Sequence, residues 1–411
     1  MPILHNIATL ASCRADGGQA ALHEIPQAAL VWEGETIRWV GAEADLPGDF
    51  DVMERLDAGG ALVVPGLIDC HTHLAFGGWR ADEFEMRILG KSYLEIARSG
   101  GGIVSTMRKT RAASEDDLLA RTKGFLQAMA RLGVTTVECK SGYGLNVEDE
   151  LKTLRVYQQL QTAQPLGIVP TFLGAHVVPP EFKGRRADYV RLLCEELIPQ
   201  IAEAGLARFC DVFVEETAFS LAEARVILET GKRYGLRPKL HADQLSDGGG
   251  ARLAAEVNAI SADHLEQTSD DGIAAMAEAG VVAVSLPLAT LYLNQPPMPA
   301  RRFIEAGVPV AVATDFNPGS APGYHLPLAL MLACTLQRMT PAEALKGATL
   351  YAAQALGLAH RLGSLEPGKQ ADFALLDTPS VNHWLYHFEA KPAVQTFVKG
   401  KVLGENGFDG L

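Results

Sequence analysis

The chain has 411 residues, of which 48% are hydrophobic and 21% are charged, as is typical of a globular protein. Its formal net charge of −13 argues against nucleic acid as a partner, because the phosphate backbone is bound by basic surfaces. It contains no run of about 18 apolar residues, so no membrane span is expected. Its six cysteines include no C-x-x-C pair and predict no disulfide framework. Since it also lacks a secretory signal, we expect a cytoplasmic protein.

Short β-strands are expected at both ends of the chain. Near the N-terminus the strand-like segments are A-A-L-V-W-E-G and T-I-R-W-V-G-A, separated by a turn at Glu33-Gly34. Near the C-terminus they are Q-A-D-F-A-L-L-D and V-Q-T-F-V-K-G-K-V-L, with turns at residues 366–368 and 399–400. Both ends therefore differ from the middle of the chain.

An apolar run, A-L-V-V-P-G-L-I-D-C-H-T-H, occupies residues 61–73. Its density of branched side chains predicts a strand buried on both faces, as in a parallel sheet. Because the side-chain period of a strand is two, His71 and His73 would leave it from the same face. Two neutral imidazoles side by side at a strand end can share one divalent metal ion.

After this run, strands alternate with helices, as in βα units around a parallel sheet. Helices are expected at Leu221–Tyr234 and Asp270–Ala279, and another from Pro341, with Thr340 as its N-cap and Glu343 at its third position. Seven further strands are predicted at Val134–Lys140, Ile168–His176, Phe209–Glu216, Arg237–His241, Ala259–His264, Val281–Leu286 and Val308–Asp315. Eight strands with intervening helices over about 250 residues predict an α/β fold, a (β/α)8 barrel.

Polar side chains gather at one end of these predicted strands. The C-terminal ends of barrel strands build the active site, so residues placed there converge on one cavity. A lone histidine at such a place is more often structural, but a group of five with an aspartate predicts a metal site. The residues that end predicted strands are His71, His73, His176, His241, His264 and Asp315.

Several motifs resemble the amidohydrolase superfamily, namely V-P-G-L-I-D-C-H-T-H, K-L-H-A-D, S-A-D-H-L-E and A-T-D-F-N-P-G. The tail G-S-L-E-P-G-K-Q-A-D-F-A-L-L-D is similar to that superfamily's return into a small β-sandwich built from both chain ends. The resemblance therefore implies a β-sandwich of residues 1–64 and 359–411 and a barrel of residues 65–358. Within the superfamily, four segments resemble the imidazolonepropionase family, which opens an imidazolone ring in histidine degradation: H-L-A-F-G-G-W-R-A-D-E-F, E-C-K-S-G-Y-G-L, F-L-G-A-H-V-V-P and T-D-F-N-P-G-S.

By this resemblance one metal ion per chain, divalent or trivalent, would be held by His71, His73, His241 and Asp315. Three imidazoles and a carboxylate suit zinc or iron. Dinuclear relatives use a carboxylated lysine on the fourth strand, where this chain offers Glu215 or Glu216 and no lysine. A single ion is therefore preferred, and a glutamate-bridged pair stays open. Lys140, at the end of the second strand, is interpreted as structural or as facing the substrate.

The implied reaction is hydrolysis of the ring amide of 4-imidazolone-5-propanoate to N-formimidoyl-L-glutamate. Asp315 would take a proton from the attacking water and pass it to the leaving ring nitrogen. His264 would stabilise or protonate the oxyanion. On a chain of net charge −13 the substrate's propionate needs a local cation, and Arg80 suits a carboxylate. The expected substrate-binding residues are Arg80, Tyr143, His176, Gln244, Asn317, Gly319 and Ser320.

The same fold also occurs in proteins of other function, which differ from this chain at the site. Related deaminases of cyclic amidines or nucleobases carry a glutamate three residues after the fifth-strand histidine, where this chain has Gln244, which cannot act as an acid or a base. A non-catalytic scaffold of this fold would lose metal ligands, whereas this chain keeps a full set, and a small-molecule binding protein would not need His264 and Asp315 together. The resemblance also implies a homodimer, while the net charge and the lack of a long apolar run predict no nucleic-acid or membrane partner.

Overall fold

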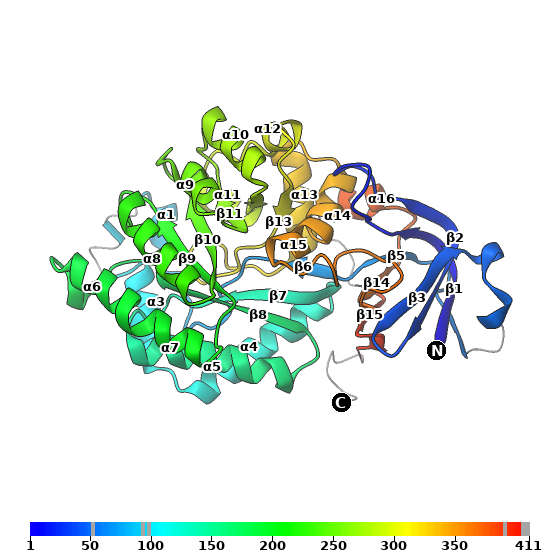
Figure 1. Cartoon of the computed structure of the whole chain (residues 1–411), viewed down its shortest axis with the longest axis horizontal. Coiled ribbons are helices and arrows are strands. Elements are labelled where there is room, and N and C mark those ends of the chain that lie inside the picture. The colour runs from blue at the N-terminus through cyan, green and yellow to red at the C-terminus, as the bar shows by residue number, and fades with distance from the viewer. Residues whose placement is uncertain (51–53, 92–94, 97–99, 389–392, 404–411) are drawn as a thin grey trace.

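Two eight-stranded sheets organise the chain in the computed structural model (Figure 1). The structure describes residues 1–50, 54–91, 95–96, 100–388 and 393–403. One sheet forms the barrel, and the other combines strands from both ends of the chain. In Figure 1 the small sheet lies at the right, with α14 and α16 between it and the barrel.

The barrel strands are neighbours in chain order and all parallel. An isolated parallel bridge between Thr72 and Phe316 joins the segments that follow the first and last strands. The predicted barrel of eight strands is therefore confirmed. Its strands are β6 (Leu67–Asp69), β7 (Val134–Lys140), β8 (Gly167–Ala175), β9 (Phe209–Val214), β10 (Arg237–Ala242), β11 (Ser261–His264), β12 (Val282–Ser285) and β13 (Val310–Val312).

Helices cover the outside of the barrel strands (Figure 1). They are α1 (Ala81–Ile88), α3 (Ile103–Ala112), α4 (Glu115–Ala130), α5 (Val147–Ala163), α6 (Arg186–Leu192), α7 (Ile198–Glu203), α8 (Leu221–Arg233), α9 (Gly250–Glu256), α10 (Asp270–Ala279), α11 (Pro287–Leu293), α12 (Ala300–Glu305), α13 (Leu326–Gln337), α14 (Pro341–Gly347), α15 (Leu350–Ala355) and α16 (Val381–Tyr386). The capping box predicted at Thr340 and Glu343 is present, and it satisfies the first free N–H groups of α14. Among the described residues, no helix combines the length and the apolar character needed to cross a membrane.

The small sheet is mixed, in the order β16-β15-β14-β5-β1-β2-β3, with β4 beside β1. Its aromatic core joins the two chain ends, because Trp32 packs edge-on against Phe373 and Phe397 at centroid distances of 5.3 and 5.7 Å. The expected small β domain made from both ends is confirmed, and its strands form one continuous sheet. They are β1 (Pro2–Ala11), β2 (Glu24–Glu33), β3 (Thr36–Ala42), β4 (Glu54–Asp57), β5 (Leu62–Pro65), β14 (Phe373–Leu376), β15 (Gln395–Val398) and β16 (Lys401–Val402).

The prediction of one strand over residues 61–73 is wrong. The run divides at Gly66 into β5, which pairs with β14 and β1 of the small sheet, and β6, which pairs with β7 of the barrel. A side chain at Gly66 would collide with Thr135, so the glycine permits the close passage from one sheet to the other. Since β6 ends at Asp69, His71 and His73 lie beyond the strand, in the segment that carries the Thr72 bridge.

Candidate metal centre

Five histidine rings meet at the C-terminal end of the barrel strands. His71 is central, with ring centroids 5.3 Å from His73, 4.6 Å from His241 and 5.8 Å from His264. His176, directly after β8, stacks on His73 at 5.5 Å. All five side chains are buried. The convergence predicted from the strand ends is therefore present in the structure.

Asp315 completes this cluster from the far side. It lies three residues beyond β13, and its N–H donates to the His71 carbonyl at 3.0 Å, which ties the last strand to the first. Its Oδ1 lies 3.3 Å from His71 Nε2 and 3.5 Å from His73 Nε2. Asp315 and His264 both adopt positive φ, at 54° and 80°, a backbone conformation that is costly for residues other than glycine and tends to occur at functional sites.

Two overlapping groups of side chains have the spacing of a metal site. Ligand atoms of His71, His73 and Asp315 lie within 4.8 Å of one another, and so do those of His71, His241 and His264. The groups share His71. Through His71 the four predicted ligands belong to one cluster of side chains, which also includes His264.

The ring nitrogens of two histidines are oriented as metal ligands require. His71 Nδ1 donates to Asp263 Oδ2 at 2.7 Å, and His241 Nδ1 contacts Asp211 Oδ1 at 3.1 Å. The Nε2 atoms of both rings are buried, and among the described residues neither has a hydrogen-bond partner. A buried nitrogen left without a partner costs about 1–3 kcal/mol, and a carboxylate on the other ring nitrogen is the usual arrangement of a ligating histidine. These residues fit a metal ion.

The protonation states also suit such a site. Burial would raise the pKa of Asp315, but the neighbouring rings of His71 and His73 hold it well below its usual value. Burial lowers the pKa of His241 to about 3 against the pull of Asp211, and it lowers the pKa of His176 well below the ordinary range. For His71, burial and Lys140 lower the pKa, but Asp263 and Asp315 raise it overall. The Asp315 carboxylate and the neutral imidazole of His241 are in the form that binds metal, whereas His71 would have to give up a proton when an ion binds.

Arg80 reaches the same end of the barrel from the segment that precedes α1. Its side chain is 8% exposed, its Nε has no hydrogen-bond partner among the described residues, and Glu83 Oε2 lies 3.7 Å away. The guanidinium lies over Gly319, where the Cβ atom of any other residue would coincide with it. Arg80 and Gly319, both predicted to bind substrate, are thus in contact.

The other predicted substrate-binding residues line the same region. Tyr143 is buried, with its ring 5.8 Å from His73 and 5.5 Å from His176. His176 Nδ1 donates to the Gly142 carbonyl at 3.1 Å, which fixes its ring. Gln244 is buried two residues beyond β10, without a hydrogen bond to another site residue in the described part of the chain.

Asn317 and Ser320 shape the loop that follows β13. The Asn317 side-chain oxygen accepts from the N–H groups of Gly319 and Ser320, both at 2.8 Å, and its amide donates to the Asp315 carbonyl at 2.6 Å. Ser320 Oγ lies 3.4 Å from Asp315 Oδ2. These bonds hold the backbone that carries Asp315 and leave Gly319 under the Arg80 guanidinium.

The alternative ligands on the fourth strand are engaged elsewhere. Glu215 accepts from the N–H of Leu245 at 2.7 Å and from Ser246 Oγ at 2.9 Å, in the loop after β10. Glu216 is exposed. Within the described residues neither belongs to a group with metal-ligand spacing.

A group of buried charges beneath the histidines was missed by sequence reasoning. The sequence does contain a signal, since E-C-K in β7 and K-L-H in β10 place charged residues at a spacing of two inside strands that must be buried. Lys140 was predicted to be structural or substrate-facing, and it lies within this group. Its members are Glu138, Lys140, Asp211, Lys239 and Asp263.

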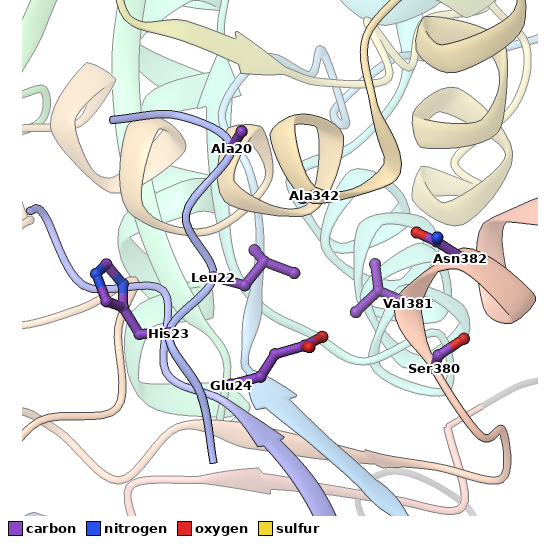
Figure 2. Close-up of a pocket in the computed structure, with 8 residues that line it drawn as sticks. All are labelled: Ala20, Leu22, His23, Glu24, Ala342, Ser380, Val381 and Asn382. Atoms are coloured by element: carbon purple, nitrogen blue, oxygen red, sulfur yellow. The ribbon is translucent and has the colours of Figure 1, made fainter. Parts of the chain in front are cut away.

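A separate hollow of about 320 Å³ lies at the junction of the small sheet and the barrel. Figure 2 shows Leu22 and Val381 facing each other across it, with Glu24 and Ser380 at its edge. It is lined by residues 20–24, by α14 and by the start of α16, so it does not adjoin the histidine cluster. Polar side chains of His23, Glu24, Ser380 and Asn382 share its lining with apolar ones, and none of them belongs to the histidine cluster.

Comparisons with known proteins agree with this geometry. The amidohydrolase family model matches residues 62–403. The chain is 47% identical to the imidazolonepropionase of Shouchella clausii over 93% of this chain and 87% of that one, and 50% identical to that of Cupriavidus necator over 94% and 93%. Among solved structures, it resembles atrazine chlorohydrolase from Arthrobacter aurescens complexed with zinc (TM-score 0.68, 20% identity, 100% and 97% coverage) and E. coli guanine deaminase (0.70, 15%, 98% and 100%).

Proposed function

The chain belongs to the amidohydrolase family and, within it, to the imidazolonepropionases, and we propose that it hydrolyses the ring amide of 4-imidazolone-5-propanoate in histidine degradation. Water adds to the ring carbonyl, the carbonyl–nitrogen bond breaks, and the leaving nitrogen gains a proton. The product is N-formimidoyl-L-glutamate. The observation that carries the proposal is the buried cluster of histidines with Asp315, in a chain 47–50% identical to relatives of that name over most of its length.

We propose that one ion, zinc or iron, is held by His71, His73, His241 and Asp315. The buried Nε2 atoms of His71 and His241, which lack a hydrogen-bond partner in the described part of the chain, support this assignment. The chemistry that such an ion supplies when bound is Lewis acidity, which polarises a carbonyl and makes water a nucleophile near neutral pH. Glu215 is already engaged by the loop after β10, which supports a single ion over a bridged pair.

In the proposed reaction Asp315 moves the proton. It is held as a carboxylate, so it can accept the proton of the attacking water and return it to the ring nitrogen that leaves. His264 lies on the neighbouring side of the cluster, 5.5 Å between centroids from His241, where its ring can stabilise the developing oxyanion. The attack on the carbonyl and the departure of the ring nitrogen would then both occur between Asp315 and His264.

Substrate recognition is assigned to the groups around the cluster. Arg80 would pair with the propionate, since its guanidinium is nearly buried and the chain as a whole is strongly anionic. Tyr143 and His176 would contact the ring or its substituents, and Gln244 would hydrogen-bond the ring. Asn317 and Ser320 would act with the backbone of Gly319, which they position.

The proposal also covers the location, the oligomeric state and the domain boundaries of the protein. All six cysteines are free thiols, which fits the reducing cytoplasm that we propose as the location. We also propose a homodimer, and a division into a β part of residues 1–64 and 359–411 and a barrel of residues 65–358. The change of sheet between β5 and β6 supports the first boundary.

The proposal is tested by turnover of freshly prepared 4-imidazolone-5-propanoate beside guanine and cytosine. We expect loss of the imidazolone with appearance of N-formimidoyl-L-glutamate, and no ammonia from either nucleobase. Release of ammonia from guanine or cytosine without imidazolone hydrolysis would establish the deaminase alternative instead. Turnover of none of the three by metal-loaded protein would favour a non-catalytic scaffold. Light scattering reports the oligomeric state independently.

A further inference from the structure

A single ammonium group lies at the centre of the buried charges beneath the histidines. Lys140 Nζ is 2.7 Å from Asp211 Oδ2, 3.0 Å from Glu138 Oε1 and 3.2 Å from Asp263 Oδ2. The side chains of all four residues are completely buried. Lys140 ends β7, while Asp211 comes from β9 and Asp263 from β11, so the ammonium joins three strands of the barrel.

Two of these carboxylates are the ones that orient histidines. Asp211 uses its other oxygen to hold His241 Nδ1 at 3.1 Å. Asp263 Oδ2, the oxygen that faces Lys140, also accepts from His71 Nδ1 at 2.7 Å. Lys140 is therefore one contact away from both histidines whose Nε2 atoms face the centre of the site.

The energetics of this arrangement depend on the ammonium. A buried carboxylate that loses its partner is destabilised by several kcal/mol, because neither solvent nor another charge compensates it. Asp211 and Asp263 both contact the same Nζ, so they are held close together by the group that also offsets their mutual repulsion. Without it the two carboxylates would separate, and the histidine rings that they hold would turn with them.

We propose that Lys140 is a positioning residue for the metal centre: its ammonium fixes the carboxylates of Asp211 and Asp263, which in turn aim the Nε2 atoms of His241 and His71 at one point. The inference rests on the proposed function only in requiring a metal site. It concerns how tightly and in what geometry the ion is held, and not which substrate is hydrolysed. In this proposal Lys140 acts through the two carboxylates and is neither a ligand of the ion nor a substrate contact.

The chain offers a matched control in Lys239. This lysine is equally buried, on β10, and it belongs to the same group of charges. Its Nζ contacts Glu138 Oε2 at 2.8 Å and the Ala355 carbonyl at 3.3 Å, and it lies over the Phe209 ring. Within the described residues it makes no ion pair with Asp211 or Asp263, and its charge acts on Asp263 only from a longer distance, after that of Lys140. Replacing Lys239 therefore removes a buried positive charge like that of Lys140, but one that does not contact the carboxylates of Asp211 and Asp263.

The experiment compares full-length Lys140→Met and Lys239→Met proteins with the wild type. Zn²⁺ affinity is measured by chelator competition, ligand geometry by the visible spectrum of Co²⁺-loaded protein, and fold stability by thermal unfolding of the metal-free protein. We expect Lys140→Met to bind Zn²⁺ about 10- to 100-fold more weakly, as when an outer partner of a ligating histidine is lost, and to show an altered Co²⁺ spectrum. We expect Lys239→Met to lose stability but to keep the wild-type affinity and spectrum.

Equal losses of affinity in the two variants would overturn the proposal, since they would reflect general destabilisation of the barrel. Wild-type affinity in Lys140→Met, or a wild type that does not bind Zn²⁺, would overturn it as well. If Lys140→Met does not fold, the double variant Lys140→Met/Asp211→Asn removes one charge of each sign and keeps the net charge of the group. It should fold and still bind Zn²⁺ weakly, whereas wild-type affinity in that protein would overturn the proposal. Turnover of imidazolone by the wild type judges the proposed function separately.

Discussion

Replacement of Gly319 by alanine should displace the Arg80 guanidinium while leaving Arg80 itself unchanged in the sequence. A methyl group at position 319 would occupy the place of the Arg80 guanidinium, so that side chain must move. The backbone of Gly319 does not need the left-handed conformation, so the substitution introduces no strain of its own. The effect therefore reports on the guanidinium and not on the fold of the loop.

The expected magnitude follows from the burial of Arg80. Its side chain is only 8% exposed, so an ion pair with the substrate's propionate would form away from water. Losing one partner of such a pair costs about 2–4 kcal/mol. Since about 1.4 kcal/mol corresponds to a factor of ten in rate, kcat/KM should fall about 30- to 700-fold, mostly through KM.

The assay is a double-mutant cycle in steady-state kinetics. Gly319→Ala, Arg80→Ala and the double variant should lose nearly the same kcat/KM, because each removes the same contact. The losses should be smaller on a neutral ester of the substrate. Gly323→Ala, in the same loop, is the control, because an added methyl group there meets nothing within 4 Å. Full activity in Gly319→Ala, or losses that add in the double variant, would refute the assignment of Arg80 to the carboxylate.

Three further predictions concern the ligands, the base and a distant acid. The double variant His71→Ala/His73→Ala should lose its metal, as elemental analysis would show, and unchanged metal content would contradict the ligand set. Metal-loaded Asp315→Asn should turn over about 10²- to 10⁴-fold more slowly, whereas a near-normal rate would assign the base elsewhere, first to His264. Burial raises the pKa of Asp372 to about 6, so its contribution to stability is present below about pH 4 and is lost as pH rises through 6. The free energy of unfolding of Asp372→Asn, relative to that of the wild type, should therefore rise by up to about 3 kcal/mol from pH 4 to pH 7. Denaturant unfolding measures it, and a difference that stays constant with pH would contradict the prediction.

The barrel could be predicted from the sequence because its strands are short apolar segments that end in polar residues. Val134–Lys140 and Asp270–Ala279 match the predicted bounds, since both lie between clear boundary residues. The strand predicted over residues 61–73 failed because local composition does not record which sheet a segment joins. Both halves of that run are equally apolar, and only the partners of β5 and β6 distinguish them.

The site was predictable where it depends on strand ends and unpredictable where it depends on pairing across strands. His176, His241 and His264 could be placed because each lies within one residue of the end of a barrel strand. The contact of Lys140 with Asp211 and Asp263 joins residues 71 and 123 positions apart, and no local pattern predicts which lysine meets which carboxylate. The fit of Arg80 over Gly319 has the same origin, because it joins two loops that meet only in the folded barrel.

The charges around the histidines bear on how many ions the site holds. Glu138, Asp211, Asp263 and Asp315 are four carboxylates, and they face two ammonium groups, those of Lys140 and Lys239. A fifth buried carboxylate, Glu266, lies 3.6 Å from His264 Nδ1 and raises the pKa of that histidine against the effect of burial, so the two can balance each other as an ion pair. With the ligand imidazoles neutral, two negative charges are left over, which is the charge of one divalent cation. A second cation would leave an excess of positive charge in a buried site, where uncompensated charge is costly. We therefore expect elemental analysis of fully loaded protein to give about one divalent ion per chain, and a value near two would show that a further carboxylate, such as Glu215, turns into the site.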